Sequence, residues 1–265
     1  MPGARFTDIR RFDTIDSTNR YLLDQARAGA PDGVVAVADH QSAGRGRLGR
    51  RWEAPAGANL LVSVLLRPEL PAPLRHLAPA VVALAAAEAA ETVAGLVLGI
   101  KWPNDLLGSD GRKVAGVLAE GDLAGGEGGP GSAAGGRPAV VVGIGINVNW
   151  PAEDGDLPDD LVGTATSLRQ EAGHPVDRWE VLDALLTALE PRLSDLGTVP
   201  GRARQAEDLR RRCTTLGTPV RVQLADSGFE GIAVDVTAEG HLVVDTGGEF
   251  RTVLAGDVVH VRRST

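Results

Sequence analysis

Lysine, cysteine and aromatic residues are scarce in this chain, and each scarcity excludes something. Only two of the 27 basic residues are lysine, Lys101 and Lys113, so nearly all cationic side chains are guanidinium groups. Cys213 is the only cysteine. This excludes an intrachain disulfide and a zinc site built from cysteines, and it fits a reducing cytoplasm. Aromatic residues make up 3% of the chain, so Ala, Val and Leu must build the core.

Long apolar runs and a positive net charge are also lacking. The longest apolar run, Leu77 to Ala90, is too short and too rich in alanine for a membrane span. The N-terminus lacks the apolar stretch of a signal peptide. The net charge of -8 disfavours a general nucleic-acid surface. We therefore expect a cytoplasmic, globular protein, and 265 residues suffice for one large domain and a small one.

Helical and strand patterns alternate over the first part of the chain. Ser17 and Asp177 are placed to cap helices that run to about Ala28 and Leu196. Two more helices are expected at Leu74–Val93 and Gly201–Arg212. The expected strands are Val34–Ala38, Asn59–Leu66, Leu96–Lys101, Val114–Glu120 and Ala139–Val148, the last two paired with each other. Residues 123–138, mostly Gly, Ala and Pro, predict a flexible insertion. The acidic segment Pro151–Val162 predicts a loop that orders with a ligand.

The pattern changes after Cys213. Five short strand-like runs follow, separated by turns that contain glycine: Val220–Leu224, Gly228–Val236, Leu242–Asp245, Phe250–Leu254 and Val258–Val261. This spacing predicts a small antiparallel barrel of SH3-like size. The expected division is a large domain over residues 1–212 and a small domain over residues 213–265.

A segment dense in arginine and glycine follows the strand expected at Val34–Ala38. It reads Asp39-His-Gln-Ser-Ala-Gly-Arg-Gly-Arg-Leu-Gly-Arg-Arg-Trp52. Glycine lets a backbone approach an anion closely, and arginine offers forked donors to phosphate or carboxylate. The repulsion among its four arginines should keep the segment open until an anion arrives. We therefore predict a loop that is mobile without ligand and folds over a bound one.

Other nucleotide and nucleic-acid motifs fit this loop less well. Gly44, Gly46 and Gly49 match the spacing G-x-G-x-x-G, but that fingerprint opens a helix, and Pro55 and Gly57 follow here. The P-loop pattern is absent, because neither lysine follows a glycine and precedes Ser or Thr. Arginine–glycine runs also occur in RNA-binding segments. The acidic net charge and the ordered flanks oppose that interpretation.

Four short motifs occur in order along the chain. They are Asp16-Ser-Thr-Asn19, Gly44-Arg-Gly-Arg-Leu-Gly-Arg50, Lys101-Trp-Pro-Asn-Asp-Leu106 with Lys113-Val-Ala-Gly116, and Gly143-Ile-Gly-Ile-Asn-Val-Asn149. Together they resemble the biotin–protein ligase family, and with the C-terminal barrel the resemblance covers nearly the whole chain. One motif alone is weak, but four at this order and spacing are specific. The resemblance implies an α+β fold: a mixed β-sheet flanked by helices, like that of class II synthetases, followed by an SH3-like β-barrel.

The resemblance implies an ATP-dependent ligase that works in two steps. The biotin carboxylate attacks the α-phosphate of MgATP and gives biotinyl-5′-AMP and pyrophosphate. A lysine of a biotin carboxyl carrier domain of an acyl-CoA carboxylase then attacks the mixed anhydride. Such transfers depend on positioning and on charge stabilisation, which fits a sequence with no convincing catalytic triad or histidine cluster. The Mg2+ ion would be held mainly by the ATP phosphates.

The resemblance also implies a set of biotin-binding residues: Ser17, Thr18, Asn19, Gln41, Gly44, Arg45, Arg47, Lys113 and Gly116. The ureido ring of biotin offers one carbonyl and two N–H groups, which suit hydroxyl, amide and backbone partners. Ser17 can also be a plain helix cap, and it can do both. Gly116 would let its strand lie against the bicyclic ring, or it is a simple strand glycine.

The residues implied for the nucleotide are Arg47, Arg50, Trp52, Asn104, Asp105, Lys113 and Asn147. Arg47 and Arg50 would close over the adenylate. Trp52 would pack near the adenine or seal the loop, and plain core packing is equally open. Asn147 would hydrogen-bond the adenine, or it is a turn residue at a strand end. Asn104 and Asp105 would contact ribose or magnesium, or they form a purely structural turn.

Three cations are the implied catalytic groups: Lys113, Arg47 and Arg45. The Lys113 ammonium is a compact point charge, and it would face the biotin carboxylate and the α-phosphate. Lys101 would lie nearby in a supporting or acceptor-facing role.

Two departures from the family pattern stand out. Leu48 takes a position where many members carry arginine, so the loop has one cation fewer. Repressor-type members carry a helix-turn-helix domain before the first motif, which begins here at Asp16. We therefore expect a ligase without repressor function, with no specific DNA partner and no membrane.

Three rival functions are open. A lipoate–protein ligase shares the architecture but should lack the Gly-Arg-Gly-Arg run. A nucleic-acid-binding regulator is opposed by the charge of -8. An inactive biotin-sensing relative is opposed by the presence of Arg45, Arg47 and Lys113.

Overall fold

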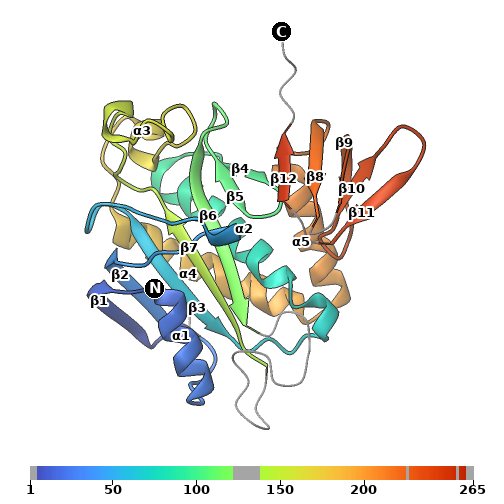
Figure 1. Ribbon diagram of the computed structural model, residues 1–265. Coiled ribbons are helices and arrows are strands. Elements are labelled where there is room, and N and C mark those ends of the chain that lie inside the picture. Colours follow the sequence, from blue (N-terminus) through green and yellow to red (C-terminus); the bar gives the residue numbers. More distant parts are fainter. Residues whose placement is uncertain (1–4, 122–137, 225–226, 255–256, 261–265) are drawn as a thin grey trace.

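The computed structural model describes residues 5–121, 138–224, 227–254 and 257–260. Nearly all of the insertion expected at 123–138 lies outside these ranges. The described residues form a large mixed sheet with helices on both faces, followed by a smaller antiparallel sheet (Figure 1). This confirms the expected α+β fold.

The large sheet has seven strands in the order β1-β2-β3-β7-β6-β5-β4. Their bounds are β1 Ile9–Ile15, β2 Val35–Gln41, β3 Leu60–Leu66, β4 Gly99–Lys101, β5 Asp105–Leu107, β6 Lys113–Gly121 and β7 Val140–Ile146. Only β1 and β2 pair in parallel, and every other pair is antiparallel. The pairing of β6 with β7 was expected from the sequence and is confirmed.

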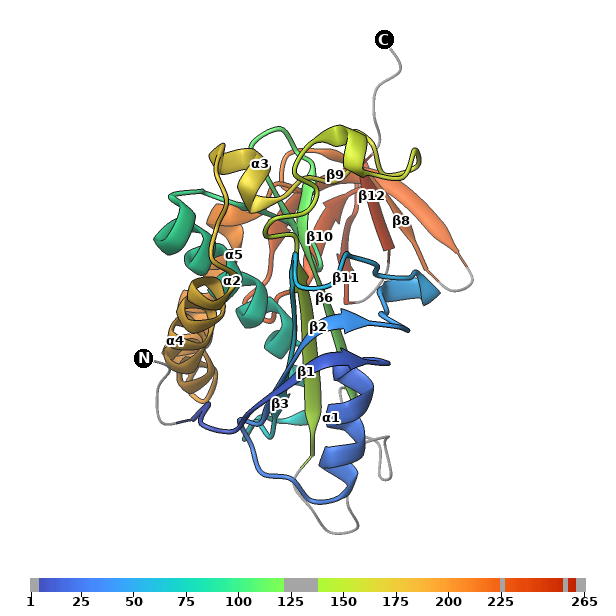
Figure 2. The ribbon, with the colours of Figure 1, turned by 90° about the vertical axis from the view of Figure 1, so that its left-hand side faces the viewer.

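Alternation along the strands divides the core between the two faces of the sheet. Leu65 and Val141 face helix α1 (Thr18–Arg27) and pack with its Leu22 and Ala26. The alternate residues, such as Val64 and Val142, face the other side and join the main core. Figure 2 shows the sheet between α1 on one side and helices α2 and α4 on the other. One face of the sheet is therefore only partly covered, by a single helix.

Helix α2 (Leu77–Ala94) is apolar around most of its circumference. It packs between the sheet and α4 (Arg178–Leu196), which is followed by α5 (Val199–Arg212). The stretch Ala72–Ala94 is long and apolar enough to cross a membrane by length and composition alone, but 61% of its most apolar window is buried inside the protein. A helix buried on all sides must be hydrophobic all round, so this composition reflects the core. The C-terminal Gly95 ends α2 in the left-handed region at φ 68°.

The smaller sheet follows α5 and has five strands in the order β11-β10-β9-β8-β12. Its strands are β8 Pro219–Gln223, β9 Gly228–Val236, β10 Leu242–Asp245, β11 Phe250–Val253 and β12 Asp257–His260, all paired antiparallel. The five strands match the five expected runs to within about a residue. Among the described residues no pairing joins β11 to β12, so this SH3-like sheet is not closed into a barrel by backbone hydrogen bonds.

Backbone and side-chain bonds attach the small sheet to the large one. The Trp102 indole donates to the Gly240 carbonyl at 3.0 Å, and the Thr214 amide donates to the Ile100 carbonyl at 2.9 Å. Cys213 is buried at this junction. The buried residues of the small sheet belong to the same hydrophobic cluster as the main core on the α2 side of the large sheet.

Some elements differ from the sequence-based expectations. Strand β1 was not expected, because Arg10, Arg11 and Asp13 interrupt its apolar pattern; it is a half-buried edge strand. The expected strand at Leu96–Lys101 is only Gly99–Lys101, and a second short strand, β5, follows Pro103. The segment Pro151–Val162, expected as an irregular loop, contains a short 3-10 helix, η3 (Asp154–Asp156).

Candidate active site

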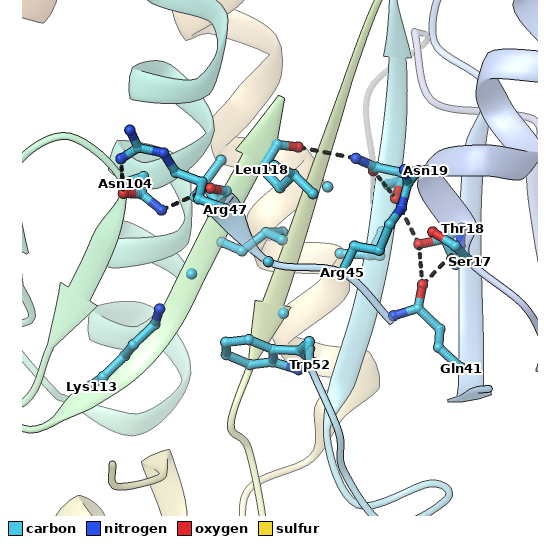
Figure 3. Close-up of a pocket in the computed structure, with 18 residues that line it drawn as sticks. Ser17, Thr18, Asn19, Gln41, Arg45, Arg47, Trp52, Asn104, Lys113 and Leu118 are labelled. Carbon is cyan, nitrogen blue, oxygen red and sulfur yellow. Dashed lines mark hydrogen bonds between the residues drawn. The ribbon is translucent and has the colours of Figure 1, made fainter. Parts of the chain in front are cut away.

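A pocket lies on the same face of the large sheet as α1, beyond the N-terminus of that helix (Figure 3). It is bounded by β3, β6 and β7 and by the segment 42–52, which we call the arginine–glycine loop. Ten of the residues expected from the motifs line it: Ser17, Thr18, Asn19, Gln41, Arg45, Arg47, Trp52, Asn104, Lys113 and Gly116. The fold thus collects residues from three of the four motifs, and Gly143 and Gly145 of the fourth also line the pocket.

Glycine residues of β6 and β7 form much of the floor of the pocket. Gly116 of β6 lies opposite Gly145 of β7, and Leu118 lies opposite Gly143. A Cβ atom on Gly143 would come within 2.3 Å of Asn19 Oδ1, and one on Gly145 within 2.5 Å of the Trp52 ring. Real Cβ contacts are never that short, so glycine is required here because other groups approach the strands closely. The glycine spacing in the fourth motif therefore encodes a flat surface.

A chain of hydrogen bonds forms the wall at the α1 end. Gln41 Oε1 accepts from the Thr18 amide at 2.8 Å and from the Thr18 hydroxyl at 3.1 Å. The Thr18 and Ser63 hydroxyls are 2.7 Å apart, and Ser63 donates to Asn19 Oδ1 at 2.6 Å. The Asn19 amide then donates to Glu120 Oε2 at 2.8 Å. Neither Ser63 nor Glu120 belongs to a motif, so no pattern in the sequence predicted either one.

Ser17 is the N-cap of α1, and it also lines the pocket. Its hydroxyl accepts from the Arg20 amide. An N-cap hydroxyl satisfies one of the free amides of the first helical turn. The cap therefore fixes Ser17 where α1 begins and sets the position of Thr18 and Asn19 after it.

Lys113 enters the pocket from the start of β6. Its Nζ lies 2.7 Å from Asp105 Oδ1, a buried oxygen with no aligned hydrogen bond, so the contact is an ion pair rather than a hydrogen bond. The same ammonium lies 5.4 Å from the centre of the Trp52 ring. Trp52 Nε1 is buried and has no hydrogen-bond partner. A buried N–H without an acceptor is costly, so this indole is ready to donate to a group that enters the pocket.

The arginines of the loop differ in their surroundings. Arg47 donates to Asn104 Oδ1 at 2.7 Å, and Asn104 in turn donates to the Val117 carbonyl at 3.0 Å. Arg45 forms an ion pair with Glu120 at 3.0 Å. Arg50 and Arg51 do not line the pocket; they border a neighbouring depression with a volume of about 550 Å³, which shares Arg45 and Arg47 with the pocket lining.

Three other motif residues lie outside the pocket lining. Asp105 faces it only through its ion pair with Lys113. Gly44 lies at the base of the loop, where Trp52 donates to its carbonyl at 3.1 Å. Asn147 is buried, accepts from Asn59 at 3.2 Å and donates to the Thr166 carbonyl at 2.9 Å, so both ends of its amide are used in the scaffold.

The free space in the pocket is small, about 50 Å³. Sites for small molecules usually have volumes of roughly 300–1,000 Å³. Trp52 and the loop residues Arg45, Gly46 and Arg47 border this space.

A second polar cluster supports the segment beside Lys113. Arg112 pairs with Asp110 at 2.5 Å and with Asp154 at 2.8 Å, and it lies 3.8 Å from Glu171. Burial acts to raise the pKa of Asp110, but hydrogen bonds from Arg112 outweigh it and lower that pKa. The Lys113 amide donates to the Thr164 carbonyl at 2.8 Å. The cluster thus holds the acidic segment 151–165 against the strand that carries Lys113.

The donor set does not form a protein metal site. Within the described ranges, no group of three or more His, Cys, Asp or Glu side chains is placed to hold a metal ion. Asp105, a carboxylate beside the pocket, is already paired with Lys113, and Glu120 is paired with Arg45. The pocket is built from cations and hydrogen-bond donors, which suits anionic ligands.

Known proteins share both parts of this architecture. Residues 11–127 match the biotin/lipoate A/B protein ligase family, and residues 215–261 match the biotin protein ligase C-terminal domain. A biotin–[acetyl-CoA-carboxylase] ligase of Mycobacterium tuberculosis is 40% identical over 255 residues, which is 93% of this chain and 86% of that protein. One from Paracoccus denitrificans is 35% identical over 86% of this chain and 90% of that protein.

A solved structure is also similar to this fold. Biotin protein ligase from Aquifex aeolicus, in complex with biotin and ATP, matches with a TM-score of 0.79 and 28% identity, over 97% of this chain and 100% of that one. The similarity extends over the large sheet and the small one together.

Proposed function

The chain belongs to the biotin protein ligase family, and from that premise we propose how its own residues join biotin to an acceptor lysine. The enzyme forms biotinyl-5′-AMP from biotin and ATP with release of pyrophosphate, and it transfers biotin to a lysine of a biotin carboxyl carrier protein. The residue assignments below rest on the geometry of the pocket.

The ureido ring of biotin binds at the α1 end of the pocket. Thr18, Asn19 and Gln41 supply hydroxyl and amide groups there, already aligned by their mutual hydrogen bonds. Such groups match a ligand with one carbonyl and two N–H groups. The bicyclic ring lies on the glycine floor of β6 and β7, where Gly116 leaves room for it. Ser17, Gly44 and Arg45 complete this side of the site.

The biotin carboxylate and the α-phosphate of ATP bind on the side of the pocket that holds Lys113. When biotin carboxylate and ATP are bound, the Lys113 ammonium leaves Asp105 and turns to the carboxylate and the α-phosphate. Arg47, held near β6 by Asn104, adds a second cation. Both charges stabilise the oxygens on which negative charge develops during adenylation. The same cations neutralise the AMP leaving group when the acceptor amine attacks the acyl carbon.

The nucleotide extends under the arginine–glycine loop. Trp52 offers an aromatic face and an unpaired indole N–H, and Arg50 lies on the loop that would close over the phosphates. Asn104 and Asp105 border the same region. Asn147 does not line the pocket, but it holds the Thr166 backbone beside Lys113 by a hydrogen bond. To contact adenine, as the motif implies, its amide would have to change hydrogen-bond partners.

Mg2+ is the metal that ATP-using ligases require. The described residues offer no carboxylate cluster for it, so we assign its ligands mainly to the ATP phosphates. Bound there, the ion withdraws charge from the triphosphate. The chain's own part is to orient the phosphates with Arg47, Arg50 and Lys113.

We assign catalysis to residues 1–212 and a supporting role to the SH3-like domain at residues 213–265. The acceptor is the biotin carboxyl carrier domain of an acyl-CoA carboxylase, as the names of the two bacterial relatives support. The reaction takes place in the cytoplasm, with no specific DNA and no membrane as partners.

One observation carries these assignments: Lys113, Arg45 and Arg47 converge on a single pocket whose floor is made of glycine. The test is incubation of the purified chain with biotin and MgATP, followed by mass detection of biotinyl-AMP, with lipoate as the competing substrate. Formation of biotinyl-AMP supports the assignment. Formation of lipoyl-AMP alone would instead make the chain a lipoate ligase.

A further inference from the structure

Glu120 is a side chain that no motif predicts, yet it forms hydrogen bonds with Asn19 and Arg45, which line the pocket. It lies near the end of β6, and residues two apart on a strand share a face. Gly116 and Leu118 of the same strand line the pocket, so Glu120 is the next residue of that row, at the rim. Its carboxylate also borders the neighbouring depression that is lined by Arg45, Arg47, Arg50 and Arg51.

One oxygen of Glu120 joins two structural elements. Glu120 Oε2 accepts from Arg45 Nη2 at 3.0 Å and from Asn19 Nδ2 at 2.8 Å. Asn19 is 4% exposed, and its other amide atom is fixed by the Ser63 hydroxyl. Glu120 therefore connects the arginine–glycine loop to a buried amide whose position is set by α1 and β3. Figure 3 shows the Arg45 side chain extending toward Asn19.

The position of Arg45 in turn fixes the base of the loop. Arg45 forms a backbone bridge with Arg51, and the Gly46 amide donates to the Arg50 carbonyl at 2.7 Å. Residues 45–51 thus form a narrow hairpin, so a contact that holds one arm of the hairpin also holds the other arm. A carboxylate at this point also offsets the mutual repulsion of the loop arginines.

We propose that Glu120 is a positioning residue for biotin: by tying Arg45 to Asn19, it holds the arginine–glycine loop in place over the ureido end of the pocket. This rests on the proposed biotin site. The tie acts on Arg45 at the proposed biotin end of the pocket, whereas Arg47 is held separately by Asn104 and Lys113 by Asp105. It therefore governs biotin binding and leaves the chemical step largely unchanged.

The experiment measures pyrophosphate release against biotin and against ATP for Glu120→Ala, Glu120→Gln and the wild type. Glu120→Ala is expected to raise the KM for biotin about three- to tenfold, as for the loss of a partly exposed charged hydrogen bond. Its kcat and its KM for ATP should stay within about twofold of the wild type. Glu120→Gln keeps an oxygen for Asn19 and loses the charge opposite Arg45, so its effect should be intermediate.

Glu53→Gln is the matched control. Glu53 pairs with Arg51 at 3.2 Å in the same part of the chain, but both side chains are about 70% exposed. The control should leave the KM for biotin unchanged. A double-mutant cycle with Arg45→Ala completes the test: in that background Glu120→Ala should have little further effect, because the tie is already broken.

Amide hydrogen exchange provides a readout independent of activity. Residues 42–52 should exchange faster in Glu120→Ala than in the wild type, while α4 exchanges at the same rate. The proposal is overturned if the KM for biotin is unchanged in Glu120→Ala, if Glu53→Gln raises it equally, or if the two substitutions in the cycle act additively. A wild-type chain that releases no pyrophosphate with biotin would instead refute the proposed function, so the two failures are distinguishable.

Discussion

Lys113 Nζ lies 2.7 Å from Asp105 Oδ1, across neighbouring antiparallel strands of the large sheet. The ammonium is thus held at the edge of the pocket by a carboxylate until an anionic ligand competes for it. Lys101, the other lysine of the chain, lies on β4 and does not line the pocket. The two lysines of one motif segment therefore have different tasks.

The first prediction follows from this pair. Lys113→Ala should lower the rate of pyrophosphate release about 100-fold or more, because a charge that stabilises the developing oxyanion is lost. Lys113→Arg should also be impaired, since a planar guanidinium cannot replace a point charge in this position. Lys101→Arg is the control and should stay close to the wild type. Near-wild-type pyrophosphate release by Lys113→Ala would show that Lys113 is not catalytic.

The second prediction concerns the glycine floor. Gly145→Ala puts a methyl group where the Trp52 ring atoms are within 2.5–2.8 Å, so the indole must shift. We expect kcat/KM for biotin to fall roughly 10- to 100-fold, the size of effect that small misplacements in a site produce. Gly248→Ala, with nothing within 4 Å of the added atom, is the control. Circular dichroism of both variants should match the wild type, and equal kinetics in the two would contradict the role of the floor.

The motifs predicted the site better than the periodicity predicted the edges of the sheet. Residues within a motif are close in the chain. Ser17, Thr18 and Asn19, for example, are consecutive at the start of a helix, so the sequence alone places them together. Glu120 and Ser63 could not be found in this way. Glu120 acts through Arg45, 75 residues earlier, and Ser63 through Thr18, 45 residues earlier. Contacts of that kind depend on strand register, which a single sequence does not state.

The missed elements have related causes. Strand β1 is parallel to β2 and only half-buried, so charged residues interrupt the alternation of apolar and polar positions by which a strand is predicted. Strand β5 is only three residues long and follows Pro103, which reads as a turn. Asn147 illustrates the opposite case. Its motif left a ligand contact and a structural role open, and the structure shows a structural contact, a buried hydrogen bond to the backbone of Thr166.

The third prediction concerns stability and the buried Arg192. This guanidinium is 7% exposed and donates to Glu88, Gln205 and Asp208, which join α2, α4 and α5. Arg192→Ala would remove a buried cation from the junction and leave the buried Gln205 and two partly exposed carboxylates without it, so the free energy of unfolding should fall by about 3 kcal/mol. Arg204→Ala breaks an exposed pair with Asp195 and should cost about 1 kcal/mol or less. Urea titration of both variants checks this, and equal losses would contradict it.

The fourth prediction concerns pH. The ring of His241 stacks on His76 with centroids 4.8 Å apart, at the junction of α2 and the small sheet. Burial first, and then the His76 charge, lower the pKa of His241 from its ordinary value of 6.5, and Glu239 opposes this in part. The unfolded chain then takes up the proton before the folded one does. Stability from this group is therefore present above about pH 6.5 and is lost as the pH falls through the lowered pKa.

The measurement is the thermal midpoint between pH 7.5 and pH 5. The midpoint of the wild type should fall over this range, and His241→Phe should flatten the curve, because the ring then carries no titrating group. His174→Phe is the control, since His174 is exposed and distant in sequence from the junction. An identical pH profile for wild type and His241→Phe would remove the His pair as a cause.

The last prediction concerns the reactivity of the enzyme with its own intermediate. A lysine amine that attacks the acyl carbon of biotinyl-AMP forms an amide and releases AMP, so a ligase can label itself when no acceptor is present. This chain carries only two lysines, and one of them is paired with Asp105 in the site. We expect weak labelling at side-chain amines after incubation with biotin and MgATP, confined to Lys101, as located by peptide mass. Lys101→Arg should abolish that signal and leave labelling of an acceptor domain unchanged. Extensive biotin on Lys113 would contradict the prediction, because a lysine whose charge stabilises the adenylate must remain protonated, and a protonated amine is not a nucleophile.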